Sequence, residues 1–251
     1  MKPVRLFSSD LDGTLVGNNE ATARFRDYWH SLPDAERPLL VFNSGRLIDD
    51  QLDLIETVPL PRPDYIIGGV GTMLFCSNDP TLSKDYVSFL GSGFDPHEIA
   101  RVMQGVPEIR RQPDQYQHGL KSSWYLHDAD QALLSEIDRR LGDNGIMARI
   151  VYSSGRDLDI LPRAADKGAA IRWLCDRLGF ELGETVVAGD TGNDRAMFEL
   201  PQARGIAVGN ALPELKSYAT GRHNVVISVE EEADGVISGL KHWMNPATMH
   251  Q

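Results

Sequence analysis

The chain has 251 residues, of which 25 are Lys or Arg and 36 are Asp or Glu, so its formal net charge is −11 at pH 7. This acidic balance argues against nucleic acids and anionic membranes as partners, because both bind through clustered basic side chains. A hydrophobic fraction of 41% and the lack of a long apolar run are typical of a globular protein without a signal peptide or membrane span. Cys76 and Cys175 are too few and too distant in sequence for a disulfide framework. We therefore expect a cytoplasmic protein with free thiols.

Short apolar runs alternate with segments of helical periodicity along most of the chain. The strands are predicted at residues 4–9, 38–43, 64–68, 185–189 and 203–208. The helices are predicted at residues 20–32, 47–57, 167–178, 194–200, 212–218 and 233–243. This alternation predicts an α/β fold with a parallel sheet and crossover helices.

The pattern changes in the middle of the chain. Strands predicted at residues 120–127 and 146–152 flank a helix at residues 129–141, and no long parallel run is present there. Several Gly and Pro residues interrupt the same stretch. We therefore predict an α+β domain at residues 84–161, inserted into a core formed by residues 1–83 and 162–251.

Two carboxylates, Asp10 and Asp12, follow the first predicted strand. Open α/β sheets bind ligands at the carboxyl ends of their strands, so this pair is a candidate site. The alternative is a hairpin turn, because Asp12-Gly13 between apolar runs is also a strong turn signal. Against the hairpin, residues 17–19 leave almost no room for a return strand.

A hydroxyl, a glycine N–H and a guanidinium follow the second predicted strand, at Ser44, Gly45 and Arg46. Such groups at the start of a helix can hold a phosphate. Taken alone, the segment is better explained as a Ser-Gly turn with a helix N-cap.

Two further segments carry charges at the start of predicted helices. Asp166-Lys167, taken alone, is an N-cap followed by a solvated lysine. After the strand at residues 185–189 come Asp190, Asn193 and Asp194, which favour a metal or phosphate site. A calcium-binding EF-hand loop is the alternative, but its spacing puts Gly192 at a ligand position.

The four segments occur in an order that resembles the haloacid dehalogenase superfamily of phosphatases, over the whole chain. The resemblance implies a Rossmann-like core with an inserted cap domain, and hydrolysis of a phosphate ester through an aspartyl phosphate. Asp10 would be the nucleophile and Asp12 the general acid and base. The remaining phosphate-binding groups would be Ser44, Gly45, Lys167 and Asn193.

The cofactor implied by the resemblance is Mg²⁺, which prefers hard oxygen ligands. Its ligands would be the Asp10 carboxylate, the backbone carbonyl of Asp12 and the Asp190 carboxylate, with Asp194 orienting bound water.

Residues 151–162 resemble the sucrose-phosphate phosphatase branch of this superfamily, and residues 42–51 and 66–71 resemble bacterial mannosylfructose-phosphate phosphatases. The resemblance implies a disaccharide phosphate as substrate, either mannosylfructose 6-phosphate or sucrose 6-phosphate. Arg46, Lys121 and Asp157 are the candidate substrate-binding residues.

Three other functions stay open at this point. A sugar phosphatase of broad specificity and a sugar phosphomutase share the same superfamily, and a receiver-like phosphoacceptor switch uses a similar set of Asp, Ser or Thr, and Lys. Receivers are single domains of about 120 residues without a cap, and they have no acid two residues after the phosphorylated Asp. We expect a monomer or weak dimer.

The histidines outside the motifs show no metal-ligand spacing and are expected at the surface: His30, His97, His118, His223, His242 and His250.

Overall fold

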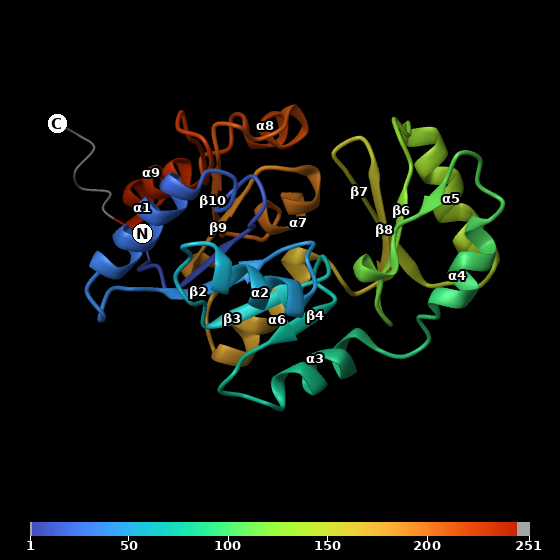
Figure 1. Ribbon diagram of the computed structural model, residues 1–251, viewed down its shortest axis with the longest axis horizontal. Helices are drawn as coiled ribbons and strands as arrows, with labels where there is room; N and C mark the ends of the chain where they lie inside the picture. The colour runs from blue at the N-terminus through green and yellow to red at the C-terminus, as the bar shows by residue number, and fades with distance from the viewer. Residues whose placement is uncertain (1, 245–251) are drawn as a thin grey trace.

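The computed structural model describes residues 2–244 and contains a seven-stranded and a four-stranded sheet (Figure 1). The large sheet has the strand order β11-β10-β9-β1-β2-β3-β4, and only the edge pair β3 and β4 is antiparallel. Its strands are β1 (Leu6–Ser9), β2 (Leu39–Asn43), β3 (Tyr65–Gly68), β4 (Met73–Phe75), β9 (Thr185–Gly189), β10 (Arg204–Ala207) and β11 (Val225–Ile227).

Helices cover both faces of this sheet. They are α1 (Asn19–Ser31), α2 (Ile48–Thr57), α3 (Leu82–Leu90), α6 (Lys167–Leu178), α7 (Arg195–Phe198), α8 (Pro213–Ala219) and α9 (Glu232–Met244), with 3₁₀ turns η2 (Leu182–Glu184) and η3 (Gly192–Asp194). Neighbouring residues of a strand point to opposite faces, and in β10 Gly205 lies against Phe198 of α7 whereas Ile206 lies against α9. Helices α7 and α9 therefore pack on opposite faces, as in a doubly wound α/β fold.

The predicted α/β core is confirmed, and its five predicted strands and six predicted helices are present with shifts of at most two residues at their ends. The prediction missed the edge strands β4 and β11 and the helix α3. Each edge strand has three residues, too few for an alternating pattern to stand out from the neighbouring turns.

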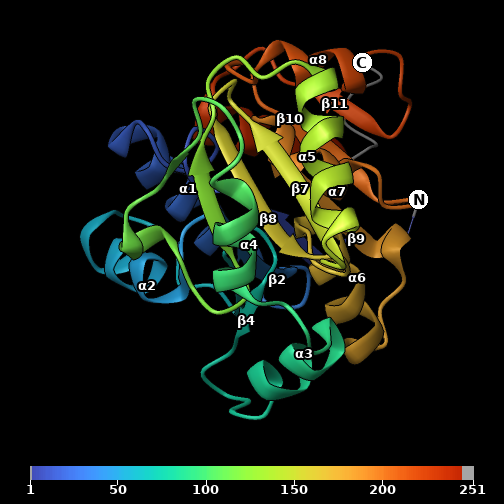
Figure 2. The ribbon, with the colours of Figure 1, turned by 90° about the vertical axis from the view of Figure 1, so that its right-hand side faces the viewer.

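The small sheet is antiparallel and has the order β5-β6-β8-β7. Its strands are β5 (Arg110–Arg111), β6 (Ser122–Tyr125), β7 (Ala148–Ser153) and β8 (Asp157–Pro162), and its helices are α4 (Pro96–Met103), α5 (Gln131–Asp143) and the 3₁₀ turn η1 (Asp114–Tyr116). Helices α4 and α5 cover the outer face of this sheet (Figure 2). We call this unit the cap; its inner face is turned toward the large sheet.

The two sheets have separate hydrophobic clusters. In the cap, Trp124 of β6 and Ile160 of β8 pack with Ile99 of α4 and Ile137 of α5. Helix α3 lies within the predicted insertion, yet its Tyr86 is fully buried in the cluster of the large sheet. The domain boundaries at 83/84 and 161/162 stay a prediction, and the packing of α3 favours a later start for the cap.

The expectation of free cysteines agrees with the structure, in which Cys76 and Cys175 are both buried and unpaired. No helix within residues 2–244 is long and apolar enough to span a membrane. His250 lies outside the described residues.

Candidate active site

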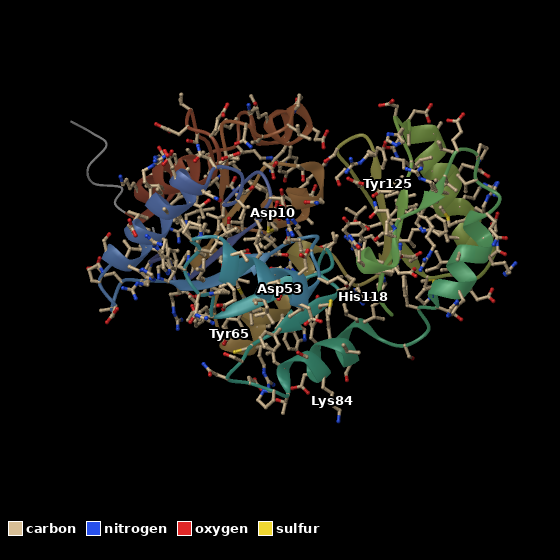
Figure 3. All side chains as sticks on the ribbon, viewed as in Figure 1. Asp10, Asp53, Tyr65, Lys84, His118 and Tyr125 are labelled. Atoms are coloured by element: carbon tan, nitrogen blue, oxygen red, sulfur yellow. The ribbon has the colours of Figure 1, made fainter. Side chains whose placement is uncertain are left out.

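The topology brings the four sequence motifs to one edge of the large sheet. Strand β1 lies between β2 and β9, so Asp10, Ser44 and Asp190 follow three adjacent strands at the same edge. A cleft of about 840 Å³ separates this edge from the inner face of the cap. Figure 3 shows Asp10 in the core and Tyr125 in the cap on opposite sides of the cleft, and both residues line it.

Nine of the eleven predicted site residues line this cleft: Asp10, Asp12, Ser44, Gly45, Arg46, Lys121, Asp157, Asp190 and Asn193. The other two, Lys167 and Asp194, lie directly beneath its floor with fully buried side chains. The cap thus faces the motifs of the core across the cleft.

The Lys167 ammonium is the central charge of the site. Its Nζ donates to Asp10 Oδ1 at 2.8 Å and to Asp194 Oδ1 at 2.6 Å. Lys167 begins helix α6, and the carboxylate of the preceding Asp166 accepts the Ala169 N–H at 2.6 Å. The N-cap interpretation of Asp166 is therefore right, but Lys167 is buried and not solvated.

Asp194 fixes the loop that carries Asp190. Its Oδ2 accepts the backbone N–H groups of Asp190 and Thr191 at 2.9 and 3.0 Å, while its Oδ1 accepts from Lys167. Asp190 Oδ1 accepts the hydroxyl of Thr14 at 3.1 Å. Asp194 is thereby oriented by three donors, and Asp190 by the hydroxyl of Thr14.

Burial and mutual repulsion perturb these carboxyl groups. Desolvation raises the pKa of Asp10, an effect that Lys167 opposes and Asp194 reinforces. Desolvation also raises the pKa of Asp190, reinforced by Asp10 and Asp194. For Lys167, desolvation opposes the charged form, but Asp10 and Asp194 outweigh it and raise the pKa of the ammonium. One buried cation thus faces three buried carboxyl groups. A single positive charge cannot balance three carboxylates.

The donor set fits a hard divalent cation. Carboxylate oxygens of Asp10, Asp190 and Asp194 lie within 4.8 Å of one another in a buried group that needs additional positive charge. Gly13 leaves the space beside them open, because a Cβ there would lie 2.4 Å from Asp190 Oδ2 and its φ is +78°. These three side chains form a buried acidic cluster whose oxygen atoms could hold a divalent cation.

Asp12 lies outside this cluster and is half exposed. Arg46 donates to it from Nε and Nη2 at 2.7 and 2.8 Å, and from Nη1 to Asp50 at 3.0 Å. Sequence reasoning placed Arg46 beside the substrate and did not foresee this pairing. Asp12 and Arg46 are 34 residues apart, so only the adjacency of β1 and β2 brings them together.

Ser44 is not the helix N-cap that its sequence context favoured. Helix α2 begins at Ile48 with Leu47 as its N-cap, and Ser44 is almost fully buried at the end of β2. Its Oγ accepts the Arg46 N–H at 3.2 Å. The resulting turn leaves Ser44 and Gly45 at the floor of the cleft.

The inner face of the cap supplies polar groups at alternate positions of its strands. The buried Lys121 ammonium lies 3.2 Å from Asp159 Oδ1, and the Ser123 hydroxyl donates to the same oxygen at 2.5 Å. Asp157 pairs with Arg156 at 2.9 Å and accepts from Gln112 at 3.0 Å. Sequence reasoning missed Asp159 and Gln112. The period-two spacing from Asp157 in β8 could have indicated Asp159.

His118 corrects the expectation of a surface histidine. It lies in the cap between η1 and β6, and its Nε2 is 2.6 Å from the hydroxyl of Thr72 in the core. Burial, with a smaller effect of the Lys121 ammonium, lowers the pKa of His118 to about 4. The sequence offered no signal for this contact, because it joins two segments 46 residues apart.

The fold, a doubly wound α/β core with the cap beside its site, is that of the haloacid dehalogenase phosphatases. The comparisons with known proteins define the group more narrowly. The chain belongs to the sucrose-6F-phosphate phosphohydrolase family, whose profile matches residues 3–244.

Individual relatives extend this assignment. A mannosylfructose-phosphate phosphatase from Agrobacterium fabrum is 64% identical over 247 residues, covering 98% of this chain and 100% of that protein. Sucrose-phosphatase 2 from Nicotiana tabacum is 32% identical, covering 93% of this chain but 58% of the tobacco protein. The crystal structure of the Synechocystis sucrose-phosphatase with sucrose and phosphate has a TM-score of 0.86 at 27% identity, covering 96% of this chain and 98% of that chain.

The buried His118 predicts a specific pH dependence of stability. An unfolded chain protonates histidine near pH 6.5, whereas folded His118 stays neutral down to about pH 4. The unfolded state binds more protons between these values, so the free energy of unfolding falls as the pH drops through this window. His118→Gln, measured by urea unfolding at several pH values, should show a shallower fall than the wild type. The exposed His97→Gln is the control, and equal slopes for wild type and His118→Gln would contradict the prediction.

Proposed function

We propose that this phosphatase hydrolyses a disaccharide phosphate, either mannosylfructose 6-phosphate or sucrose 6-phosphate, to the free sugar and phosphate. The observation that carries the proposal is the single cleft that joins the buried charges around Asp10 to the polar inner face of the cap. A phosphoryl group needs only the core end of this cleft, so the cap end is available for the sugar. The names of the Agrobacterium and Synechocystis relatives support the same substrate class.

In the proposed reaction Asp10 is the nucleophile. Its carboxylate attacks phosphorus, the bond between phosphorus and the sugar oxygen breaks, and Asp12 gives its proton to the leaving oxygen. Asp12 then takes a proton from water, which attacks the aspartyl phosphate and releases phosphate, restoring Asp10. Proton transfer by Asp12 requires that its ion pair with Arg46 opens, so we propose that Arg46 turns to the substrate at that stage.

We propose Mg²⁺ as the cofactor. Asp10, Asp190 and the backbone carbonyl of Asp12 would hold it, with Asp194 supporting the site through the Asp190 loop. When bound, the ion neutralises charge on the phosphoryl oxygens. Ser44, the Gly45 N–H, Asn193 and the Lys167 ammonium would bind the remaining oxygens, and the hydrogen bond from Lys167 orients the Asp10 carboxylate and favours its ionised form.

Lys121 and Asp157 are proposed to bind the sugar. Both lie on the inner face of the cap, where Asp159 holds Lys121 and Gln112 holds Asp157. Because these side chains are already ordered, they lose less conformational entropy when they bind the hydroxyl groups of a sugar. We further propose a cytoplasmic monomer or weak dimer whose partner is this small molecule. A sugar phosphatase of broad specificity and a phosphomutase are the competing functions, and the assays below separate them.

Removal of divalent cations should abolish hydrolysis. Without a cation, the repulsion among Asp10, Asp190 and Asp194 is unbalanced and phosphate would meet an acidic cluster. Phosphate release is measured in EDTA and again after Mg²⁺ is added in excess. Full activity in EDTA would show that the cluster is not a cofactor site.

Asp10→Asn and Asp12→Asn should each lower kcat by at least about 100-fold, but through different steps. With p-nitrophenyl phosphate, whose leaving group needs little protonation, Asp12→Asn should accumulate a phosphorylated protein, since it retains the nucleophile and lacks the base. Asp10→Asn should give no phosphorylated protein. Mass spectrometry after an acid quench measures this difference, with the exposed Asp27→Asn as control. Turnover above about a tenth of wild type in Asp10→Asn would exclude this nucleophile.

Disaccharide phosphates should exceed monosaccharide phosphates in kcat/KM. With a monosaccharide phosphate, polar groups of the cap lack the hydroxyl groups of the second sugar and remain unpaired. The resulting loss of kcat/KM can reach several orders of magnitude. We expect mannosylfructose 6-phosphate or sucrose 6-phosphate to exceed fructose 6-phosphate and glucose 6-phosphate by at least about 100-fold. Equal rates on all four esters would indicate a general sugar phosphatase. Transfer of phosphate to another position of the sugar, without release, would indicate a mutase.

A further inference from the structure

His118 makes a directional contact from the cap to the core. Its Nδ1 accepts the backbone N–H of Leu120 at 3.1 Å, so the ring proton belongs on Nε2. Nε2 then donates to Thr72 Oγ1 at 2.6 Å, and the Thr72 hydroxyl donates to the Gly69 carbonyl at 2.8 Å. Figure 3 shows His118 on the side of the cap that faces the core. Every polar atom in this chain of hydrogen bonds has a defined role.

Thr72 ends an unusual turn, residues 69–72, which we call the latch turn. Gly69, Val70 and Gly71 have φ values of +57°, +58° and +88°. A left-handed conformation is ordinary for glycine, but it is an outlier for a β-branched residue such as Val70. The surrounding structure must therefore hold Val70 in place, and strained residues of this kind concentrate at functional sites.

The latch turn is bonded directly to the proposed phosphate-binding segment. The Val70 N–H donates to the Ser44 carbonyl at 3.1 Å, and the Gly69 N–H donates to the Arg46 carbonyl at 2.9 Å. The side chain of Val70 is buried and lies beside Gly45. A displacement of this turn would therefore displace the backbone of Ser44 and Gly45.

The other side of the latch turn touches the start of helix α6. Gly71 lies so close to this helix that a Cβ would be 2.3 Å from the carbonyl of Asp166, the residue before Lys167. The Tyr86 hydroxyl of α3 donates to the Gly71 carbonyl at 2.6 Å and fixes the turn from below. The latch turn thus contacts the backbone of two of the residues proposed to bind phosphate, Ser44 and Lys167.

We propose that His118 is a positioning residue that couples the placement of the cap to the phosphate pocket. Through Thr72 it holds the latch turn, and the latch turn sets the backbone of Ser44 and the start of α6. The cap thereby orders the phosphate pocket from outside, although His118 is not among the residues lining the cleft. This inference rests on the phosphatase function and does not depend on which sugar is bound.

The test compares four single variants and one double variant. His118→Ala and Thr72→Val remove the contact, whereas His118→Gln keeps a donor near Nε2 and Thr72→Ser keeps the hydroxyl. Binding of inorganic phosphate in the presence of Mg²⁺ is measured by calorimetry, alongside kcat, KM and the thermal unfolding midpoint. The exposed His97→Ala on α4 is the matched control.

We expect His118→Ala and Thr72→Val to weaken phosphate binding by roughly 3-fold to 30-fold, the range found for couplings carried by packed networks. His118→Gln and Thr72→Ser should recover most of the loss. The double variant, His118→Ala with Thr72→Val, should bind phosphate no more weakly than either single variant, because both substitutions remove the same contact.

Unchanged phosphate binding in folded His118→Ala and Thr72→Val would overturn the inference, as would losses that multiply in the double variant. If His118→Ala does not fold, the comparison of Thr72→Val with Thr72→Ser decides the question in the same way. Failure of the proposed function is distinguishable, because the wild type would then hydrolyse no phosphate ester, whatever the variants do.

Discussion

The buried ammonium of Lys167 is the interaction on which the site depends. It joins Asp10 after β1 to Asp194 after β9, two groups that would repel each other in its absence. Removing one partner of a buried ion pair leaves an uncompensated charge, so substituting any one of these three residues should lower the stability of the fold. The same cation favours the ionised form of Asp10, at a position where burial raises the pKa of this carboxyl group to about 7. Helix α6, its N-cap residue Asp166 and the order of the strands together determine the position of this charge.

A protein of net charge −11 that binds a phosphate dianion requires local positive charge at the site. The core provides Lys167, backbone N–H groups and an acidic cluster suited to a divalent cation, and the cleft also receives Arg46. Arg46 is paired with Asp12 and Asp50, so its charge is neutralised by these carboxylates unless the ion pairs open. Local arrangement therefore outweighs the total charge.

Neighbouring residues of the cap strands point to opposite faces, so one face packs against the helices and the other faces the cleft. Trp124, Leu158 and Ile160 point outward and form the cluster with α4 and α5, whereas Tyr125, Asp157 and Asp159 line the cleft. A change on the inner face, where we propose that the sugar binds, can thus be made with little effect on the packing of the cap. The link from His118 to the latch turn would connect this specificity surface to the phosphate pocket.

The sequence by itself determined the α/β core. It also indicated an inserted α+β unit and singled out the motif residues from Asp10 to Asp194, because strand and helix periodicities and the residues that follow each strand are local properties. It did not indicate the pairing of Asp12 with Arg46, the buried state of His118 or the contacts of Asp159 with Lys121 and Ser123. These depend on contacts between segments distant along the chain, which strand order and cap packing create. The edge strands β4 and β11 were missed for a related reason. Three residues carry too little pattern, and only pairing with a neighbouring strand makes them part of the sheet.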